Sequence, residues 1–492
     1  MKKITYKICA IVAAGITAVG CTSFLNVESI GKSTIETFFQ DVTGLQAAGV
    51  GLHRELLEFY DDDFLFYADL AGDMVNLVAV NANEAETRIH NFNNRPEDNG
   101  GYVRNIWGGG YTVITNANNI LYYGAKLRDL CPSETEQKII DKVFGWAYFT
   151  RALVTLDLCH IYAQPYGFTA DASHLGVPCV TTVYGFEDIV ARSTVKECYD
   201  QAVEDLNTAY GLLGDEFTDP TYISGLACQA LLARVYLYMG DYDNAEKYSK
   251  AVMDRITLTP RDEYVDMYRN AGKVAGSESI LRMNNYDATS HMKSVTDPTV
   301  NYSMVPNDAL LAMYPENDIR RELMTYIPEP TEKEFAGQTF TACTKYCAYK
   351  SITDEKARRV DPFVLRGSEM YLIHAEALCN RAAPDLAGAV ADIKALEARA
   401  RGISASSVNL PYSDAASVNA LIEKERILEL CFEGHRLLDI LRRGQDLKRP
   451  DCTTSNTKII KYPDYRFALP ICQMEMQSNE NMIQNDGYSV TE

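Results

Sequence analysis

The sequence predicts a mainly all-α protein, a helical superhelix with loop-rich, partly irregular insertions that carry short hairpins. Three observations lead to this fold class. Apolar residues recur every three or four positions over several long stretches, as they do on one face of a helix. A twelve-residue spacing between two small residues occurs twice, and in its first occurrence an aromatic residue lies between them. Between its two occurrences, over 257–353, the helical period is lost and Pro, Asn, Gly and Tyr become frequent.

The N-terminus has the pattern of a secretory signal. Three lysines precede the apolar run 8–19, which is too short to span a bilayer. The residues AVGC at 18–21 resemble a lipobox, in which a signal peptide, here 1–20, is cleaved before a cysteine that carries diacylglycerol. Lipid attachment is therefore predicted at Cys21, where acyl chains would hold the protein on a membrane without a spanning helix. An ordinary signal peptide with an incidental cysteine is the alternative.

Composition excludes one class of partner. The 492 residues are 47% hydrophobic, which is ample for a large core, and they carry a formal net charge of −20. Such a surface repels phosphate backbones and anionic lipid headgroups. We therefore expect no nucleic-acid partner, and we expect a neutral ligand rather than a heavily sulfated or uronate-rich one.

The clearest repeat is a helix pair typical of tetratricopeptide units. Ala233 and Ala245 stand twelve residues apart with Tyr236 between them, and Gly240 and Asp241 supply a turn. Stacked pairs of this kind bury a continuous core and curve into a superhelix. The same twelve-residue spacing returns at Ala375 and Ala387. The two tetratricopeptide-like units are predicted at about 224–256 and 364–400.

The stretch 421–444 predicts one long, core-facing helix. Its apolar residues recur at three- and four-residue steps, and its charged residues form opposite-sign pairs one turn apart. Gly434 in mid-helix costs about 1 kcal/mol relative to Ala, which suggests that another backbone packs closely there.

The same stretch also allows an enzymatic interpretation. Glu425, Glu429 and Glu433 lie one turn apart, and two suitably spaced carboxylates can hydrolyse glycosides. A general acid needs a raised pKa, however, whereas the neighbouring arginines favour ionised carboxylates. The sequence contains no GxSxG or HExxH motif and no recognised Cys–His signature. We predict that these glutamates form structural ion pairs and that the protein is not an enzyme.

No metal or other cofactor is predicted. The three acids at 61–63 resemble a solvated turn, because a calcium loop spaces its ligands alternately, and calcium stays a minor alternative. Cys343 and Cys347 are the only close cysteine pair after the signal peptide, and no second pair or histidine at ligand spacing completes a zinc site. The sequence leaves open the disulfide state of the eleven cysteines other than Cys9 and Cys21. Four of them lie in helical apolar stretches and are predicted to fill the core: Cys159, Cys228, Cys379 and Cys431.

The chain resembles the SusD/RagB family of outer-membrane nutrient-binding lipoproteins along almost its whole length. The string ERILELCFEGHRLLDILRRG at 425–444 resembles the C-terminal signature of that family. The pattern W-x3-Y-x2-I-x2-A-N at 107–118 resembles a helical segment of the family, and P-x4-E followed by N-x2-QN-x-GY at 470–488 resembles its closing motif. The resemblance implies a single SusD-like domain over 21–492. Its expected parts are an N-terminal helical and loop part (about 33–220), a loop-rich insertion (about 257–353) and the C-terminal signature (421–492).

The resemblance also implies a function. Members of the family sit on the extracellular face of the outer membrane, held by a lipid anchor, above a TonB-dependent transporter of the SusC type. A member that serves carbohydrate uptake binds oligo- or polysaccharide, delivers it to the transporter and acts as a lid. The RagB branch is associated with peptides, so a peptide-binding lipoprotein of a similar uptake complex is the alternative.

Ligand contacts are expected in two loop regions, 67–107 and 284–314. The apolar faces and dense hydroxyls of sugars suit aromatic rings that stand beside Asn, Asp and Arg. The stretch 76–101 is rich in Asn, Asp and Gly and predicts one long loop, a kind of segment that is often functional. The candidate ligand-binding residues are Asp73, Asn76, Arg88, Trp107, Tyr286, Tyr302 and Tyr314.

Overall fold

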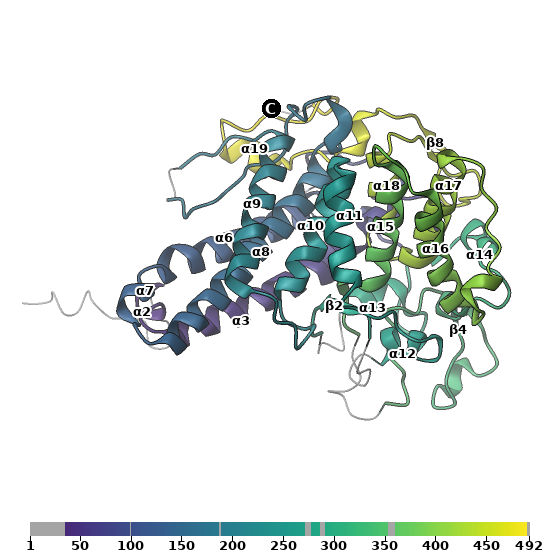
Figure 1. Cartoon of the computed structure of the whole chain (residues 1–492). Coiled ribbons are helices and arrows are strands. Elements are labelled where there is room, and N and C mark those ends of the chain that lie inside the picture. Colours follow the sequence, from purple (N-terminus) through teal and green to yellow (C-terminus); the bar gives the residue numbers. More distant parts are fainter. Residues whose placement is uncertain are drawn as a thin grey trace, which may run out of the picture.

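The computed structural model describes residues 35–98, 100–185, 188–270, 277–285, 291–352 and 360–489 (Figure 1). Within these ranges the chain is mainly helical, and its short strands pair two by two. The predicted fold class, a mainly all-α protein with irregular insertions, is confirmed. In the same ranges, no helix is both long and apolar enough to cross a membrane.

Four long helices form the N-terminal part and lie on the left and centre of Figure 1. They are α3 Val42–Phe59, α6 Tyr102–Gly124, α8 Glu134–Tyr162 and α9 Val195–Leu213. α8 is central, because it packs against the other three and almost every residue of 143–158 is buried. A capping box between Thr194 and Glu197 begins α9. The shorter elements here are α2 Ile35–Phe38, η1 Tyr60–Phe64, α4 Leu65–Leu70, α5 Glu84–Asn91, α7 Leu127–Leu130 and η2 Tyr166–Phe168.

Two predictions for this part are wrong. The acids at 61–63 do not lie in a solvated turn but in η1, a π-helical turn that joins α3 to α4, where Asp63 is buried. The stretch 76–101 is not one loop, because Asn83 and Glu86 form a capping box that begins α5. Both elements are too short to show a helical apolar period in the sequence.

Both tetratricopeptide-like helix pairs are present. The first is α10 Gly225–Met239 with α11 Tyr242–Met253, and the second is α15 Gly367–Asn380 with α16 Leu386–Arg401. Gly240 takes a φ of 75° at the end of α10, a conformation that suits glycine. Ala387 is exposed, and Ala389 fills the expected inside position in its place. α11 packs against α15, so the two pairs stack although a long insertion separates them in sequence.

The insertion between the pairs is irregular, as expected, and it is tied to both sides of the molecule. β4 Thr325–Tyr326 and β5 Phe340–Thr341 form a small antiparallel pair. β2 Ser279–Arg282 pairs with β6 Phe363–Arg366, and β3 Met304–Pro306 pairs with β1 Val75–Leu77 of the N-terminal part. The helices of the insertion are η3 Arg261–Glu263, α12 Tyr264–Arg269, α13 His291–Thr296, α14 Asp308–Met313, η4 Ile319–Met324 and η5 Lys333–Phe335.

The predicted continuous helix over 421–444 is wrong. The structure has α17 Ala415–Leu430 and α18 Arg436–Arg442, separated by a turn in which Phe432 has a φ of 62° and Gly434 a φ of 79°. The Asp69 carboxylate accepts hydrogen bonds from the backbone N–H groups of Phe432 (3.1 Å) and Gly434 (2.6 Å). The close approach expected at Gly434 is present, since a Cβ there would lie 2.9 Å from the backbone oxygen of Leu65.

The glutamates of the signature stretch form buried ion pairs, as predicted. Burial opposes ionisation of Glu429, but three guanidinium charges outweigh it and hold its pKa well below the usual value. Burial opposes ionisation of Glu433 too, and nearby cations still lower its pKa to about 2. Burial dominates at Glu425 and raises its pKa to about 7. The pairs are Glu425 with Arg320, Glu429 with Arg320, Arg366 and Arg399, and Glu433 with Arg366 and Lys345.

The end of the chain runs back over the N-terminal helices, where Figure 1 shows it in yellow. Asn485 Nδ2 donates hydrogen bonds to the backbone oxygens of Tyr162 (2.8 Å) and Leu469 (2.7 Å), which ties this segment to the end of α8. The short elements beyond α16 are η6 Ala405–Ser407, β7 Leu447–Lys448, β8 Ile459–Ile460, η7 Tyr465–Phe467 and α19 Gln473–Ser478.

We expect Asp69→Ala to lower the free energy of unfolding by about 2–4 kcal/mol, because two N–H groups of the 431–435 turn lose a charged acceptor. Urea unfolding is measured at pH 8, since burial raises the pKa of Asp69 to about 7. Asp243→Ala removes an exposed aspartate of α11 and is the matched control, with an expected change below about 0.5 kcal/mol. Equal losses in the two variants would contradict the role of Asp69.

Candidate ligand-binding site

The structure brings the two predicted loop regions together. β1 and β3 pair antiparallel, with Val75 opposite Pro306 and Leu77 opposite Met304. The pairing continues past the strands, because the N–H of Val78 donates to the backbone oxygen of Ser303 at 2.8 Å. Segments more than two hundred residues apart in the chain therefore form one surface. We call 78–98, 100–103 and 297–304, with the aromatic rings described below, the paired-loop surface.

α5 lies in the middle of this surface and carries contacts on two sides. Glu86 accepts a hydrogen bond from the Ser303 hydroxyl at 2.5 Å, and just before α5 the side-chain amide of Asn81 donates to the backbone oxygen of Tyr302 at 2.7 Å. On another side of the helix, Arg88 forms ion pairs with Glu84 (2.5 Å) and with Asp98. The helix thus separates the segment around Tyr302 from a hollow around Arg88.

The hollow beside Arg88 is open and polar, with a volume of about 260 Å³. Guanidinium, carboxylate and amide groups stand close together in it, so it offers hydrogen-bond donors and acceptors to a ligand rich in hydroxyls. Its size suits one sugar ring rather than a long chain. The residues that line it are Glu84, Ala85, Arg88, Asn94, Glu97, Asp98, Gly100, Tyr102 and Val103.

On the Tyr302 side, three aromatic rings gather at the surface. The ring centroids of Tyr302 and Phe340 are 6.3 Å apart, and those of Phe335 and Phe340 are 6.0 Å apart. All three side chains are partly exposed. Val80, which directly precedes Asn81, is 91% exposed. Exposed apolar groups beside polar loops are typical of a binding surface.

The seven sequence-predicted ligand residues fall into three groups. Arg88 and Tyr302 lie on the paired-loop surface, and Tyr286 lies outside the described residues, as does the predicted lipid-attachment residue Cys21. The other four are engaged within the protein, and a ligand role for any of them stays a prediction. Asp73 binds Arg436 at 2.6 Å, Asn76 accepts a hydrogen bond from the N–H of Thr453, Trp107 donates to Glu475 and Tyr314 donates to the backbone oxygen of Leu428.

Trp107 is an aromatic residue of the kind that binds sugars, but its side chain lies inside the protein. Its side chain is 4% exposed, and the rings of Tyr111 and Tyr162 lie 4.9 and 5.0 Å from it. In this conformation no open ring face is presented to a sugar. The structure adds Phe335 and Phe340 as candidates that the sequence did not suggest, and their only signal in the sequence is a pair of aromatics that flank a polar Gly-containing turn.

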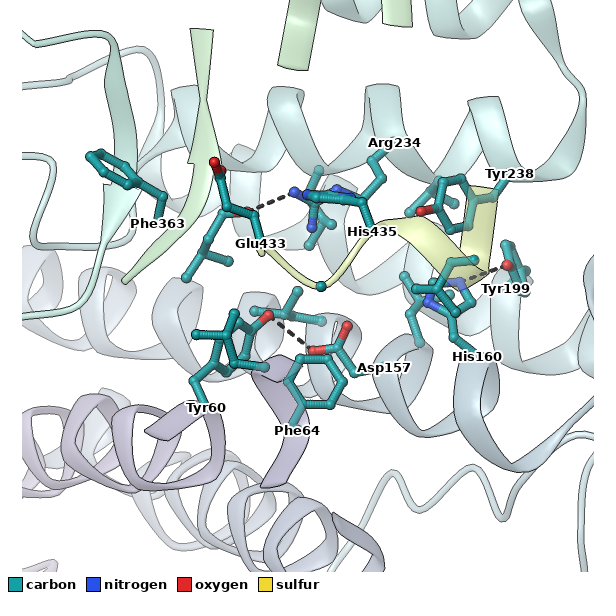
Figure 2. A pocket seen from close by; sticks show the side chains of 18 residues that line it. Tyr60, Phe64, Asp157, His160, Tyr199, Arg234, Tyr238, Phe363, Glu433 and His435 are labelled. Carbon is teal, nitrogen blue, oxygen red and sulfur yellow. Dashed lines mark hydrogen bonds between the residues drawn. The ribbon is translucent and has the colours of Figure 1, made fainter. Parts of the chain in front are cut away.

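A second hollow lies inside the molecule and has a different character (Figure 2). It measures about 40 Å³, room for a few water molecules and no sugar. Tyr60 donates a hydrogen bond to Asp157 at 3.1 Å, and burial raises the pKa of Asp157 to about 7. Burial lowers the pKa of His160 to about 3 and that of His435 to about 4. This interior cavity keeps its histidines neutral and is part of the scaffold.

A Cys–His contact lies beneath α5. Cys452 Sγ is 3.2 Å from His90 Nε2, and His90 Nδ1 is 2.8 Å from the backbone oxygen of Leu70. Burial opposes ionisation of Cys452, but electrostatic and hydrogen-bond interactions with His90 and Thr454 together outweigh it and lower the pKa of Cys452 to about 6. Both side chains are 0% exposed, so no substrate can reach the thiol in this conformation.

The fold and the paired-loop surface together indicate to which class of protein the chain belongs. Stacked helix pairs form the scaffold, the acids of the signature stretch are held in ion pairs, and polar and aromatic loops are exposed. The arrangement is that of a binding protein.

The chain belongs to the SusD/RagB family. The family model described as the SusD family matches residues 242–488, and a second model, described as starch-binding and associating with the outer membrane, matches residues 24–237. This is a family of SusD-like, non-catalytic carbohydrate-binding proteins. The predictions of the family and of a protein without enzymatic activity are confirmed.

Similar proteins cover almost all of the chain. SusD-like protein P2 of Formosa agariphila is 25% identical over an alignment of 536 positions, gaps included, that covers 99% of this chain and 100% of that protein. A crystal structure of a SusD superfamily protein from Bacteroides vulgatus is 25% identical, covers 91% of this chain and 99% of its own, and has a TM-score of 0.77. A laminarin-binding SusD-like protein is 23% identical with the same coverage and a TM-score of 0.70, a likeness that shows the fold.

The interior cavity generates a prediction about pH. His435 is neutral in the folded protein down to about pH 4 but gains a proton near pH 6.5 when unfolded. The unfolded state therefore binds more protons between these values, and this histidine lowers stability as pH falls from 6.5 toward 4. We expect the urea midpoint of wild type to fall relative to that of His435→Gln when pH is lowered from 7 to 5. A difference between the two midpoints that does not change with pH would contradict this.

Proposed function

We propose that this protein captures oligo- or polysaccharide at the extracellular face of the outer membrane. It delivers the ligand to a SusC-like TonB-dependent transporter, over which it acts as a lid. Membership in a carbohydrate-binding family associated with the outer membrane supports the first part of this function. The partner and the lid role rest on the family alone.

The single observation that carries the proposal is the β1–β3 pairing. It places a polar hollow and an aromatic cluster on the two sides of one short helix, α5. An oligosaccharide has two kinds of surface, because its hydroxyls bind polar groups and its C–H faces pack on aromatic rings. A surface that presents a polar hollow and an aromatic cluster side by side suits an oligosaccharide better than a single sugar.

Arg88 and Tyr302 are the contacts that we propose on this surface. Glu84 and Asp98 orient the Arg88 guanidinium, and a guanidinium has five N–H groups, more than these two ion pairs require. The backbone bond from Asn81 to Tyr302 and the ring of Phe340 position the tyrosine. A laminarin-binding relative with the same fold makes laminarin the first polysaccharide to test.

We further propose that Cys21 carries the lipid anchor. Expressed at full length in a host that matures lipoproteins, the wild-type protein should incorporate labelled fatty acid and partition into detergent. Cys21→Ala should do neither, because it lacks the thiol that accepts diacylglycerol. A matched control is Cys9→Ala, which removes a cysteine within the signal peptide and should leave labelling intact. Labelling of the Cys21→Ala protein would overturn the assignment.

Binding is tested by affinity electrophoresis of the form that starts after Cys21, in gels cast with different polysaccharides. We expect retardation by one of them and about tenfold weaker binding for Tyr302→Ala, because loss of a stacked ring costs about 1–1.5 kcal/mol. Arg88→Ala should weaken binding similarly. Tyr122→Ala is the matched control, since Tyr122 is exposed near the far end of α6, about 30 Å along the helix from Tyr102.

The outcomes separate the alternatives. Equal retardation of Tyr302→Ala and Tyr122→Ala would move the site away from the paired-loop surface but keep carbohydrate capture. If no polysaccharide retards the wild-type protein and a peptide library binds to it, the RagB-like peptide function replaces the proposal.

A further inference from the structure

Two cysteine side chains meet where the segment after α8 joins α9. Cys179 Sγ lies 3.3 Å from Cys198 Sγ, and the two residues are 19 positions apart in the chain. Cys198 is fully buried in the first turn of α9, whereas Cys179 is partly exposed. Both are free thiols in this structure. The observation is independent of the ligand site and of the proposed function.

The backbone on both sides of this contact is already held in place. The N–H of Gly176 donates to the backbone oxygen of Ser193 at 2.7 Å, and the N–H of Ser193 donates to the backbone oxygen of Val177 at 3.1 Å. Next to Cys179, the side-chain amide of Asn118 donates to the backbone oxygen of Val180 at 2.9 Å. A disulfide bond has a sulfur–sulfur length of about 2.05 Å, so the sulfurs need to approach by on the order of 1 Å.

We propose that Cys179 and Cys198 form a disulfide bond in the secreted protein. The oxidant is a disulfide carrier, either a protein dithiol oxidase or a small disulfide such as oxidised glutathione. The Cys179 thiolate attacks the carrier disulfide and releases one carrier thiol. Cys198 then displaces the second carrier thiol from the mixed disulfide. Two electrons pass to the carrier, and the two protons of the cysteine thiols end on the two carrier sulfurs.

The exposure and the protonation of the two thiols determine which of them reacts first and how fast. Cys179 is the more exposed thiol, so the carrier reaches it first. The hydrogen bond with Cys198, aided by burial, raises the pKa of Cys179, and a protonated thiol is a poor nucleophile. The folded dithiol therefore reacts slowly with the carrier. Disulfides persist outside the cytoplasm, where a secreted chain resides.

The bond would secure a junction of three segments. Arg192 is buried beside it, and its guanidinium donates to the backbone oxygens of Gly176 (2.6 Å), Tyr162 (3.2 Å) and Ile483 (2.9 Å). Asn479 also donates to the backbone oxygen of Val190 at 3.0 Å. The end of α8, the segment before α9 and the closing segment of the chain therefore share this anchor. A covalent link between residues 179 and 198 restricts the unfolded chain between them and so stabilises the folded junction.

The test uses the full chain secreted by its host and the same chain refolded with oxidised glutathione. Free thiols are blocked with N-ethylmaleimide in denaturant, and the protein is digested without reduction and analysed by mass spectrometry. We expect a linked pair of peptides containing Cys179 and Cys198, lighter by two hydrogens than the separate peptides and split by dithiothreitol. Cys179→Ser should lose this species, and Cys131→Ser, which removes a buried cysteine elsewhere, should keep it.

Stability supplies a second readout. Reduction should lower the thermal midpoint of the wild-type and Cys131→Ser proteins by several degrees and leave that of Cys179→Ser unchanged. N-ethylmaleimide on both Cys179 and Cys198 in the secreted and the refolded wild-type protein would overturn the proposal. So would a link from Cys198 to Cys159, which lies beside it on α8.

Discussion

The structure depends on one buried carboxylate, that of Glu429 in α17. Its two oxygens accept hydrogen bonds from Arg366 (2.8 Å), Arg399 (2.8 Å) and Arg320 (2.9 Å). Each arginine comes from a different region: Arg320 from η4 of the insertion, Arg366 from the end of β6 and Arg399 from α16. Removal of one member of such a cluster leaves uncompensated charge in the interior, which costs several kcal/mol. The insertion, the second helix pair and the signature helix are therefore held in one arrangement.

This arrangement also supports the surface that we assign to ligand capture. Tyr314 follows α14 and donates to the backbone oxygen of Leu428, one residue from Glu429. This hydrogen bond ties the insertion to α17. β3 precedes α14 in the same insertion and pairs with β1 of the N-terminal part. Loops that bind ligands work best on a rigid base, because less order has to be gained on binding. In the proposed function, the buried charges act by holding the loops of the paired-loop surface in position.

The same charges explain why the cluster of acids in the signature stretch does not form an active site. A glycosidase needs two carboxyl groups in a cleft with different and tuned pKa values. Glu429 and Glu433 are buried and paired with cations, which keeps them ionised. Only Glu425 has a raised pKa, and it is 1% exposed behind Arg320. Family membership agrees with this, and the ligand specificity of such a scaffold belongs to its loops.

The sequence by itself determined the class of fold, the two helix pairs and the family, because helical periods, small-residue spacings and motifs are local properties of the chain. Only the tertiary structure decided where the signature helix breaks, since the carboxylate that holds the turn, Asp69, lies 363 residues away from Phe432. It likewise decided that Trp107 packs inside while Tyr302 reaches the surface, although both are aromatics in predicted loop regions. Burial depends on which segments meet, and neither the β1–β3 pairing nor the Cys179–Cys198 contact leaves a local trace in the sequence.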